Sequence, residues 1–229
     1  MTFGDRVLSY YNQLDFNGSL PKGIQIMNPF VNNPLVDKIL RQFCKKFYND
    51  GNSRFAILGI NPGRFGAGVT GIPFTDTKRL KEKCGIAVNA FQTHEPSSVF
   101  VYDAIEEYGG VYSFYEKFYM GAVCPLGFTS TSSRGRTINS NYYDTEELLG
   151  SVYDFIIESI KKQLEFGIER DICFCLGTGK NERFLSRINN EHRFFKKLVA
   201  LEHPRFIMQY RARQKKDYIN KYITAFRFV

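Results

Sequence analysis

The sequence predicts an α/β fold of three layers, in which helices cover both faces of a central four-stranded, mainly parallel sheet. First, several apolar runs lack strict polar alternation, which is typical of strands buried on both faces. Second, segments with helical periodicity separate these runs, at a spacing of about 40 residues. Third, 229 residues with 43% hydrophobic content suffice for a full core, so we expect a single domain over residues 1–229.

The expected strands and helices alternate along the chain. The apolar runs predicted as strands cover residues 54–60, 119–126, 171–177 and 197–203. The predicted helices cover residues 33–48, 96–110, 111–119, 144–167, 180–189 and 211–226. In the longest helix, Asp144 is expected at the N-cap and Gly167 just past the end. The polar segment 129–141 is too long for a tight turn and is expected to be a functional or mobile loop.

Charge and hydropathy narrow the functional classes. A net charge of +8 and a pI near 9.2 favour a polyanionic partner. No stretch approaches the about 20 apolar residues of a membrane span. The N-terminus has an early Asp5 and no apolar run of the kind found in signal peptides, so a cytoplasmic location is expected.

The cysteines indicate reduced thiols, because their number is five and no secretion signal is evident. Cys173 and Cys175 lie in a predicted buried strand, where their side chains share one face. They are either metal ligands or small core residues. The core interpretation fits better, because no Cys-x-x-Cys pair or histidine cluster completes a site. We therefore expect no metal and no organic cofactor.

The most informative segment is AILGINPGRFGAGVTGIPF, residues 56–74, at the carboxyl end of the first predicted strand. Ligands of open α/β sheets bind at this edge. Gly63, Gly66 and Gly68 form either an anion-binding nest of backbone N–H groups or an ordinary turn. Their order differs from the dinucleotide fingerprint, and no Lys-Ser/Thr pair closes a Walker A loop.

The motifs at the strand ends together resemble those of the single-strand-selective monofunctional uracil-DNA glycosylases. GINPGRFG and TGIPF are similar to that family's first motif, with Ile60, Arg64 and Ile72 as the departures. CPLGF and CLGTGKNERFLSRI resemble later strand ends, and EHPRFIMQYR resembles the second motif, in which Arg205 and Phe206 replace Ser-Pro. The resemblance covers roughly residues 54–216 with motif order intact, which is typical of one fold with one active site.

The resemblance implies a pocket that grips a base rotated out of the DNA stack. Phe74 matches the family's stacking aromatic, although a core role is the alternative interpretation. Gly63 matches a position where some relatives carry a bulky residue, so a roomier pocket is implied. Ile60 and Phe65, on the same motif, are expected to contact the base as well.

Asn61 and His203 are the expected catalytic residues. Asn61 carries no proton-accepting charge, so it orients water but barely activates it, and the glycosidic bond must break first. The base then leaves as an anion, and catalysis stabilises that charge. The family match places His203 against the uracil O2; a capping or core histidine is the alternative. His94 and His192 are interpreted as surface residues.

The sequence differs from this family's pattern at the asparagine whose side-chain amide hydrogen-bonds the uracil edge. The matching position here is Ala122. Either the substrate range differs, or Asn139 and Asn141 fold back over the pocket from the polar segment. Simple solvation of these two side chains is the alternative interpretation.

The segment after His203 is expected to contact DNA. Residues 205–210 combine apolar Phe206 and Met208 with flanking cations, which suits a wedge between base steps. The expected phosphate contacts come from basic side chains at four positions: Arg64, Arg205, Arg211 and Lys215. A second basic run, residues 78–83, is equally explained as a solvated helix face.

The sequence therefore favours a monofunctional DNA glycosylase of base excision repair, acting as a monomer on single- or double-stranded DNA. It would flip out uracil or a related deaminated or oxidised base and hydrolyse the N-glycosidic bond. No dedicated Schiff-base lysine is evident, so strand cleavage is not expected. The alternative is a non-catalytic nucleotide- or phosphate-binding module that uses the glycine-rich loop.

Overall fold

The central sheet forms from apolar segments that become buried on both faces. The computed structural model describes residues 1–229. The strands are β2 (Arg54–Gly59), β3 (Phe118–Ala122), β6 (Ile168–Leu176) and β7 (Lys197–Leu201), which pair in the order β3-β2-β6-β7. All three pairings are parallel, which confirms the predicted sheet. The second predicted strand is shorter than expected and ends at Ala122.

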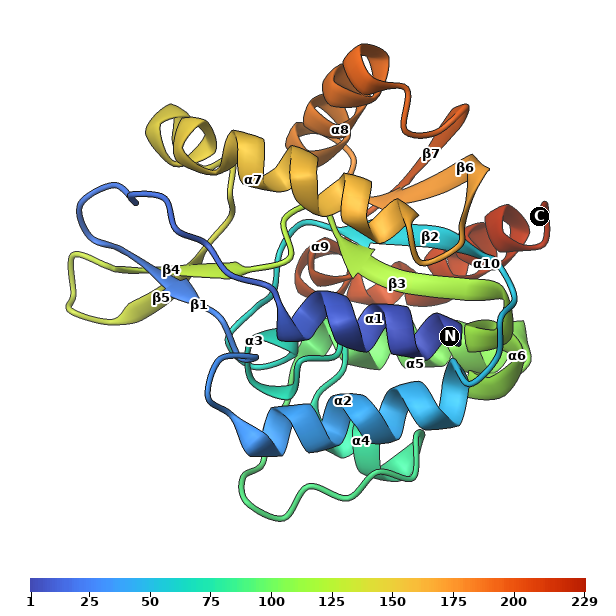
Figure 1. The fold of residues 1–229 in the computed structure, drawn as a ribbon. Coiled ribbons are helices and arrows are strands. Elements are labelled where there is room, and N and C mark those ends of the chain that lie inside the picture. Colours follow the sequence, from blue (N-terminus) through green and yellow to red (C-terminus); the bar gives the residue numbers. More distant parts are fainter.

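Helices cover both faces of this sheet, which confirms the three-layer prediction (Figure 1). One face carries α7 (Glu146–Leu164) and α8 (Lys180–His192). The other carries α5 (Pro96–Tyr108), α6 (Gly110–Lys117) and α10 (Lys215–Phe226). Phe174 from the middle of β6 packs against Phe226 of α10 with ring centroids 5.1 Å apart. Such contacts pack the sheet against its helices, and the loops that carry the site follow the carboxyl ends of the strands.

The remaining helices are α1 (Phe3–Asn12), α2 (Pro34–Phe47), α3 (Ala67–Thr70), α4 (Thr77–Glu82) and α9 (Pro204–Tyr210), with a 3₁₀ turn, η1 (Ala212–Gln214), before α10. The long helix α7 is capped by Thr145 and not by Asp144, because the Thr145 hydroxyl accepts the Leu148 N–H at 3.1 Å. Gly167 lies past its end with φ of +97°, as expected. None of the helices combines the length and apolar character that crossing a membrane requires.

The polar segment 129–141 is a β-hairpin, so the expectation of a loop is wrong. β1 (Ile24–Met27), β4 (Gly127–Thr131) and β5 (Thr137–Ser140) form a small antiparallel sheet in the order β1-β4-β5. β-branched residues occupy much of both hairpin strands, and such residues favour extended backbone. Gly135, with φ of +71°, allows the turn between them. In Figure 1 this sheet extends from the body of the molecule beside the end of β3.

All five cysteines are buried with free thiols. Cys173 and Cys175 belong to the hydrophobic core of β6. No group of three or more His, Cys, Asp or Glu side chains gathers anywhere in a way that would hold a metal ion. The basic run 78–83 lies on and just after α4, and its cations pair with acidic neighbours, as in the Lys78–Glu82 and Lys83–Glu106 pairs.

Candidate active site

The carboxyl ends of the four parallel strands open into one cavity of about 620 Å³. Residues directly after β2, β3, β6 and β7 all line it, together with the hairpin and α9. This is the sheet edge at which the sequence predicts a ligand site. Its lining includes Asn61, Phe74, Asn139 and His203, which lie far apart in the sequence.

The glycine-rich loop after β2 is a tight turn in which the N–H groups of two of its three glycines donate within the loop. The N–H groups of Gly66 and Gly68 both donate to the Gly63 carbonyl, at 3.2 and 2.9 Å. The Arg64 N–H donates to the Asn139 side-chain oxygen at 3.2 Å. These three donors are therefore occupied within the protein. Close packing explains Gly68, because a Cβ there would lie 2.8 Å from the Gly63 carbonyl oxygen.

Asn61 is held by the end of the hairpin. Its side-chain N–H₂ donates to the Ser140 carbonyl at 3.2 Å, and its side-chain oxygen accepts the Tyr142 N–H at 3.1 Å. These two bonds fix which end of the amide is oxygen and which is nitrogen. An amide oxygen has two lone pairs, so one acceptor site on Asn61 is left for a ligand or water.

Phe74 lies across the end of β2. Its backbone has φ of +54°, which is rare for a residue with a side chain and is maintained only by surrounding packing. A Cβ on Gly59 would lie 2.7 Å from the Phe74 ring, so glycine is needed at that position. The ring centroid is 5.6 Å from that of His203. The ring thus lines the cavity beside the imidazole and is not enclosed in the core.

His203 is a neutral hydrogen-bond donor to the cavity. Its Nδ1 accepts the backbone N–H of Arg205 at 3.1 Å, which caps α9. Since Nδ1 acts as the acceptor, the ring proton resides on Nε2. Burial, and then the nearby Arg205 charge, lower the pKa of His203 to about 4. The capping role and a role at the site therefore coexist, because each uses a different ring nitrogen.

Asn139 and Asn141 both line the cavity, as do Ile60, Gly63 and Ala122. The hairpin places Asn139 there, since it lies in β5 and holds the glycine loop through Arg64. Asn141 is held by Asp144, whose carboxylate accepts both its backbone and side-chain N–H groups. Neither side chain is simply a solvated loop residue, because both line the cavity and both form hydrogen bonds within the protein.

The segment after His203 is the helix α9, which presents one face at the cavity rim. Arg205, Phe206 and Tyr210 line the rim, and the Phe206 and Tyr210 rings lie 5.5 Å apart. Phe206 is 40% exposed and Tyr210 is 61% exposed. Met208 packs instead against the hydrophobic core and does not line the cavity.

Besides Met208, four of the expected contact residues lie outside the cavity lining. Phe65 is 49% exposed, and the Arg64 guanidinium lies 4.4 Å from its ring centroid. Arg211 is exposed and lies over the Phe206 ring. Lys215 forms an ion pair with Asp103 at 2.7 Å, which partly neutralises its charge.

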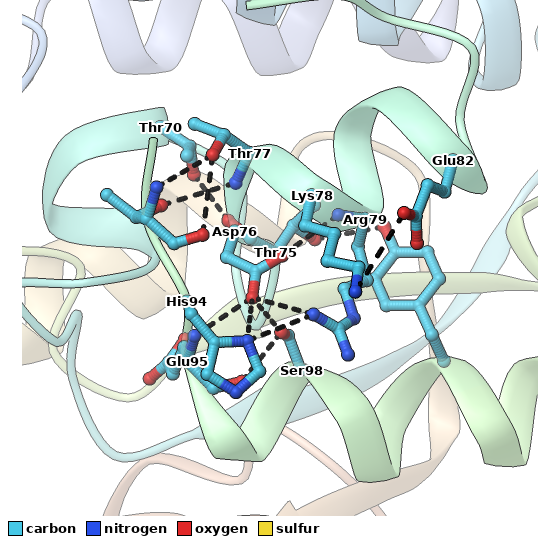
Figure 2. Close-up of polar contacts among 12 residues, drawn as sticks. Thr70, Thr75, Asp76, Thr77, Lys78, Arg79, Glu82, His94, Glu95 and Ser98 are labelled. Atoms are coloured by element: carbon cyan, nitrogen blue, oxygen red, sulfur yellow. Dashed lines mark hydrogen bonds and ion pairs between the residues drawn. The ribbon is translucent and has the colours of Figure 1, made fainter. Parts of the chain in front are cut away.

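Glu95 is the only carboxylate that lines the cavity, and the sequence did not point to it. Its position is set by Asp76, whose carboxylate accepts the Glu95 backbone N–H at 2.9 Å. Figure 2 shows Glu95 beside this Asp76-centred group of polar contacts. The local signal was a Glu-Pro pair that starts a helix, and nothing in it points to a site.

The fold and this cavity define an α/β/α protein in which an amide, an imidazole and an aromatic ring converge at the strand ends. A family model of the Uracil DNA glycosylase superfamily matches residues 45–227. The crystal structure of wild-type SMUG2 from Pedobacter heparinus is 54% identical to this chain, aligns with 99% of it and 97% of that chain, and has a TM-score of 0.97. A comparison with curated proteins found no match.

The chain belongs to the uracil-DNA glycosylase superfamily, and within it to the SMUG-type enzymes. It is a DNA N-glycosylase, a hydrolase of DNA repair whose substrate is DNA. Nothing in the comparisons favours the non-catalytic nucleotide-binding alternative.

Proposed function

We propose that the cavity receives uracil, or a related deaminated or oxidised base, after the nucleotide rotates out of the DNA stack. The observation that carries this proposal is the convergence of Phe74, Asn61 and His203 on one cavity. A flipped base needs an aromatic surface for its face and polar groups for its pairing edge. Phe74 supplies the surface, and Asn139 and Asn141 supply side-chain amides in place of the one that Ala122 lacks.

In this proposal the reaction is dissociative. The bond between C1′ and the base breaks first, and its electron pair leaves with the base. The Nε2–H of His203 donates a hydrogen bond to the base carbonyl that gains negative charge, which lowers the barrier most at the transition state. Asn61 holds the water that then bonds to C1′, through the free acceptor site on its side-chain oxygen.

The exposed rings of α9 support the second part of the proposal. Phe206 and Tyr210 lie at the rim, where an apolar side chain would occupy the gap left by a flipped base. We propose that the enzyme acts as a monomer on single- or double-stranded DNA, and that it leaves an abasic site without cutting the strand.

The test uses the purified protein and oligonucleotides that carry uracil, 5-hydroxymethyluracil, hypoxanthine or xanthine at one position, in single- and double-stranded form. Alkali cleaves the strand at each abasic site, so the cleaved fraction measures excision. We expect excision of uracil, and the other bases define how far the cavity tolerates substitution. Cleavage without alkali would contradict monofunctional chemistry, and an uncut uracil strand would contradict the proposed substrate.

A further inference from the structure

Glu95 has no role in the chemistry described so far, although its carboxyl group faces the glycine loop. It lies at the N-cap of α5 but makes no capping hydrogen bond with its side chain. A Cβ added to Gly63 would lie 3.3 Å from Glu95 Oε1, and one added to Gly66 would overlap Oε2. The Glu95 carboxyl group therefore occupies the space that the missing side chains of Gly63 and Gly66 leave. Gly63 follows Asn61 by two residues in the sequence.

The polar group around Asp76 holds Glu95 in this position (Figure 2). The buried Asp76 carboxylate accepts the Glu95 N–H at 2.9 Å, the Ser98 hydroxyl at 2.8 Å and the Arg79 N–H at 2.9 Å. This arrangement fixes the backbone on both sides of Glu95. The Glu95 carboxyl itself has no hydrogen-bond partner in the protein, which leaves it available to a ligand or to water.

The surroundings of Glu95 raise the pKa of its carboxyl group toward neutral pH. Burial, and then the Asp76 carboxylate, raise the pKa of Glu95 to about 7, and Arg205 from α9 opposes them. Arg79 and the exposed His94 face the Asp76 side of this group. Arg64, on the glycine loop, lies over the Phe65 ring instead.

Hydrolysis needs a group that takes a proton from water, and the cavity offers few. The amide of Asn61 does not accept a proton at neutral pH. His203 has Nδ1 engaged by the Arg205 N–H and Nε2 already protonated. Arg205 is the only other charged side chain in the lining, and it is a cation. Among the charged side chains of the lining, Glu95 is therefore the one that can accept the proton.

We propose that Glu95 is a further catalytic residue, the general base that accepts a proton from the attacking water. This inference rests on the proposed function. As the water oxygen bonds to C1′, one of its protons passes to the Glu95 carboxylate, and from there to the departing base anion or to solvent. After the base leaves, the sugar cation at C1′ either bonds to water or recombines with the base. Loss of Glu95 as the proton acceptor slows the reaction with water and therefore slows net hydrolysis.

The test is single-turnover excision of uracil by wild type and Glu95→Gln, from about pH 5 to about pH 8. The wild-type rate should rise with pH as Glu95 ionises and should level off above its pKa of about 7. Glu95→Gln should be slower by about 10²-fold or more at neutral pH and should lose this rise. Glu107→Gln, an exposed glutamate of the same helix, is the matched control and should behave as wild type.

Glu95→Ala provides a second variant, to which formate is added as a small replacement carboxylate. Recovery of rate with formate supports the general base, since a structural role would not respond. An unchanged rate and pH profile in Glu95→Gln would overturn the inference while the proposed function stands. If Glu95→Gln slowed excision of some bases much more than of others, the inference would also be overturned. Glu95 would then recognise the base and would not act on the water. A wild type without uracil excision would count against the proposed function instead.

Discussion

At the scale of single residues, backbone groups determine what the two proposed catalytic side chains can do. The Ser140 carbonyl and the Tyr142 N–H fix the orientation of the Asn61 amide. The Arg205 N–H fixes the His203 tautomer, with the proton on Nε2. Each side chain is therefore held before substrate arrives, and a fixed donor or acceptor stabilises developing charge without reorganisation.

Asn61→Ala and His203→Ala should each lower the single-turnover rate of excision by roughly 10²-fold or more. The reason is the loss of one preorganised contact to the reacting groups. His203 is neutral above its pKa of about 4, so its protonation should not shape the rate above about pH 5. His192→Ala, an exposed histidine, is the control. Near-wild-type rates in both site variants would show that the assignment is wrong.

Phe74→Ala should weaken capture of the flipped base by about 1–3 kcal/mol, the usual contribution of base–aromatic stacking. The structure favours this effect because the ring lines the cavity and lies beside His203. The measurement is the substrate concentration that half-saturates single-turnover excision, compared with the melting temperature of the variant. A lower melting temperature with unchanged excision would instead assign the ring to the core.

At the scale of elements, α9 divides its side chains between the core and the cavity rim. Ile207 is fully buried and Met208 packs on the core, so they anchor the helix. Phe206 and Tyr210, four positions apart, share the opposite face and remain exposed. Exposed aromatic rings next to a ligand cavity are typical of an interaction surface.

The double variant Phe206→Ala/Tyr210→Ala should impair excision from paired DNA more than from single strands. In single strands little stacking has to be broken, so a wedge contributes less. The ratio of the two excision rates is the measurement. Met208→Ala is the control and should lower the melting temperature without changing that ratio. Equal losses on both substrates would remove the wedge role from α9.

At the scale of the whole molecule, the net charge of +8 favours association with DNA, but the ion pairs decide which cations are available. Arg211 is exposed and forms no ion pair, whereas Lys215 is paired with Asp103. Both residues follow α9, so they can be compared directly. They differ in that an acidic neighbour, Asp103, neutralises part of the charge of Lys215 only.

Arg211→Ala should weaken DNA binding across sequences and lower the salt dependence of affinity by about one released counterion. Lys215→Ala should lower it by less, because Asp103 already neutralises part of the Lys215 charge. The measurement is the slope of binding affinity against salt concentration for both variants. A larger change for Lys215→Ala would mean that its pair with Asp103 opens when DNA binds.

The sequence alone determined the fold class, the positions of the four central strands and the family. Apolar runs and helical periodicity are local properties, and tertiary contacts do not alter them. The motif that contains Asn61 and Phe74 and the motif that contains His203 are also contiguous, so their order identified the glycosylase superfamily.

Only the tertiary structure decided how the groups of the site are combined. Asn139 reaches the glycine loop from a hairpin that composition alone made resemble a loop, and Glu95 approaches Gly63 from the start of α5. The N–H groups of Gly66 and Gly68 that suited a phosphate are occupied inside the turn, and Lys215 is paired with Asp103. Each of these facts depends on which distant partner satisfies a polar group, and chain folding sets that choice, because no local pattern encodes it.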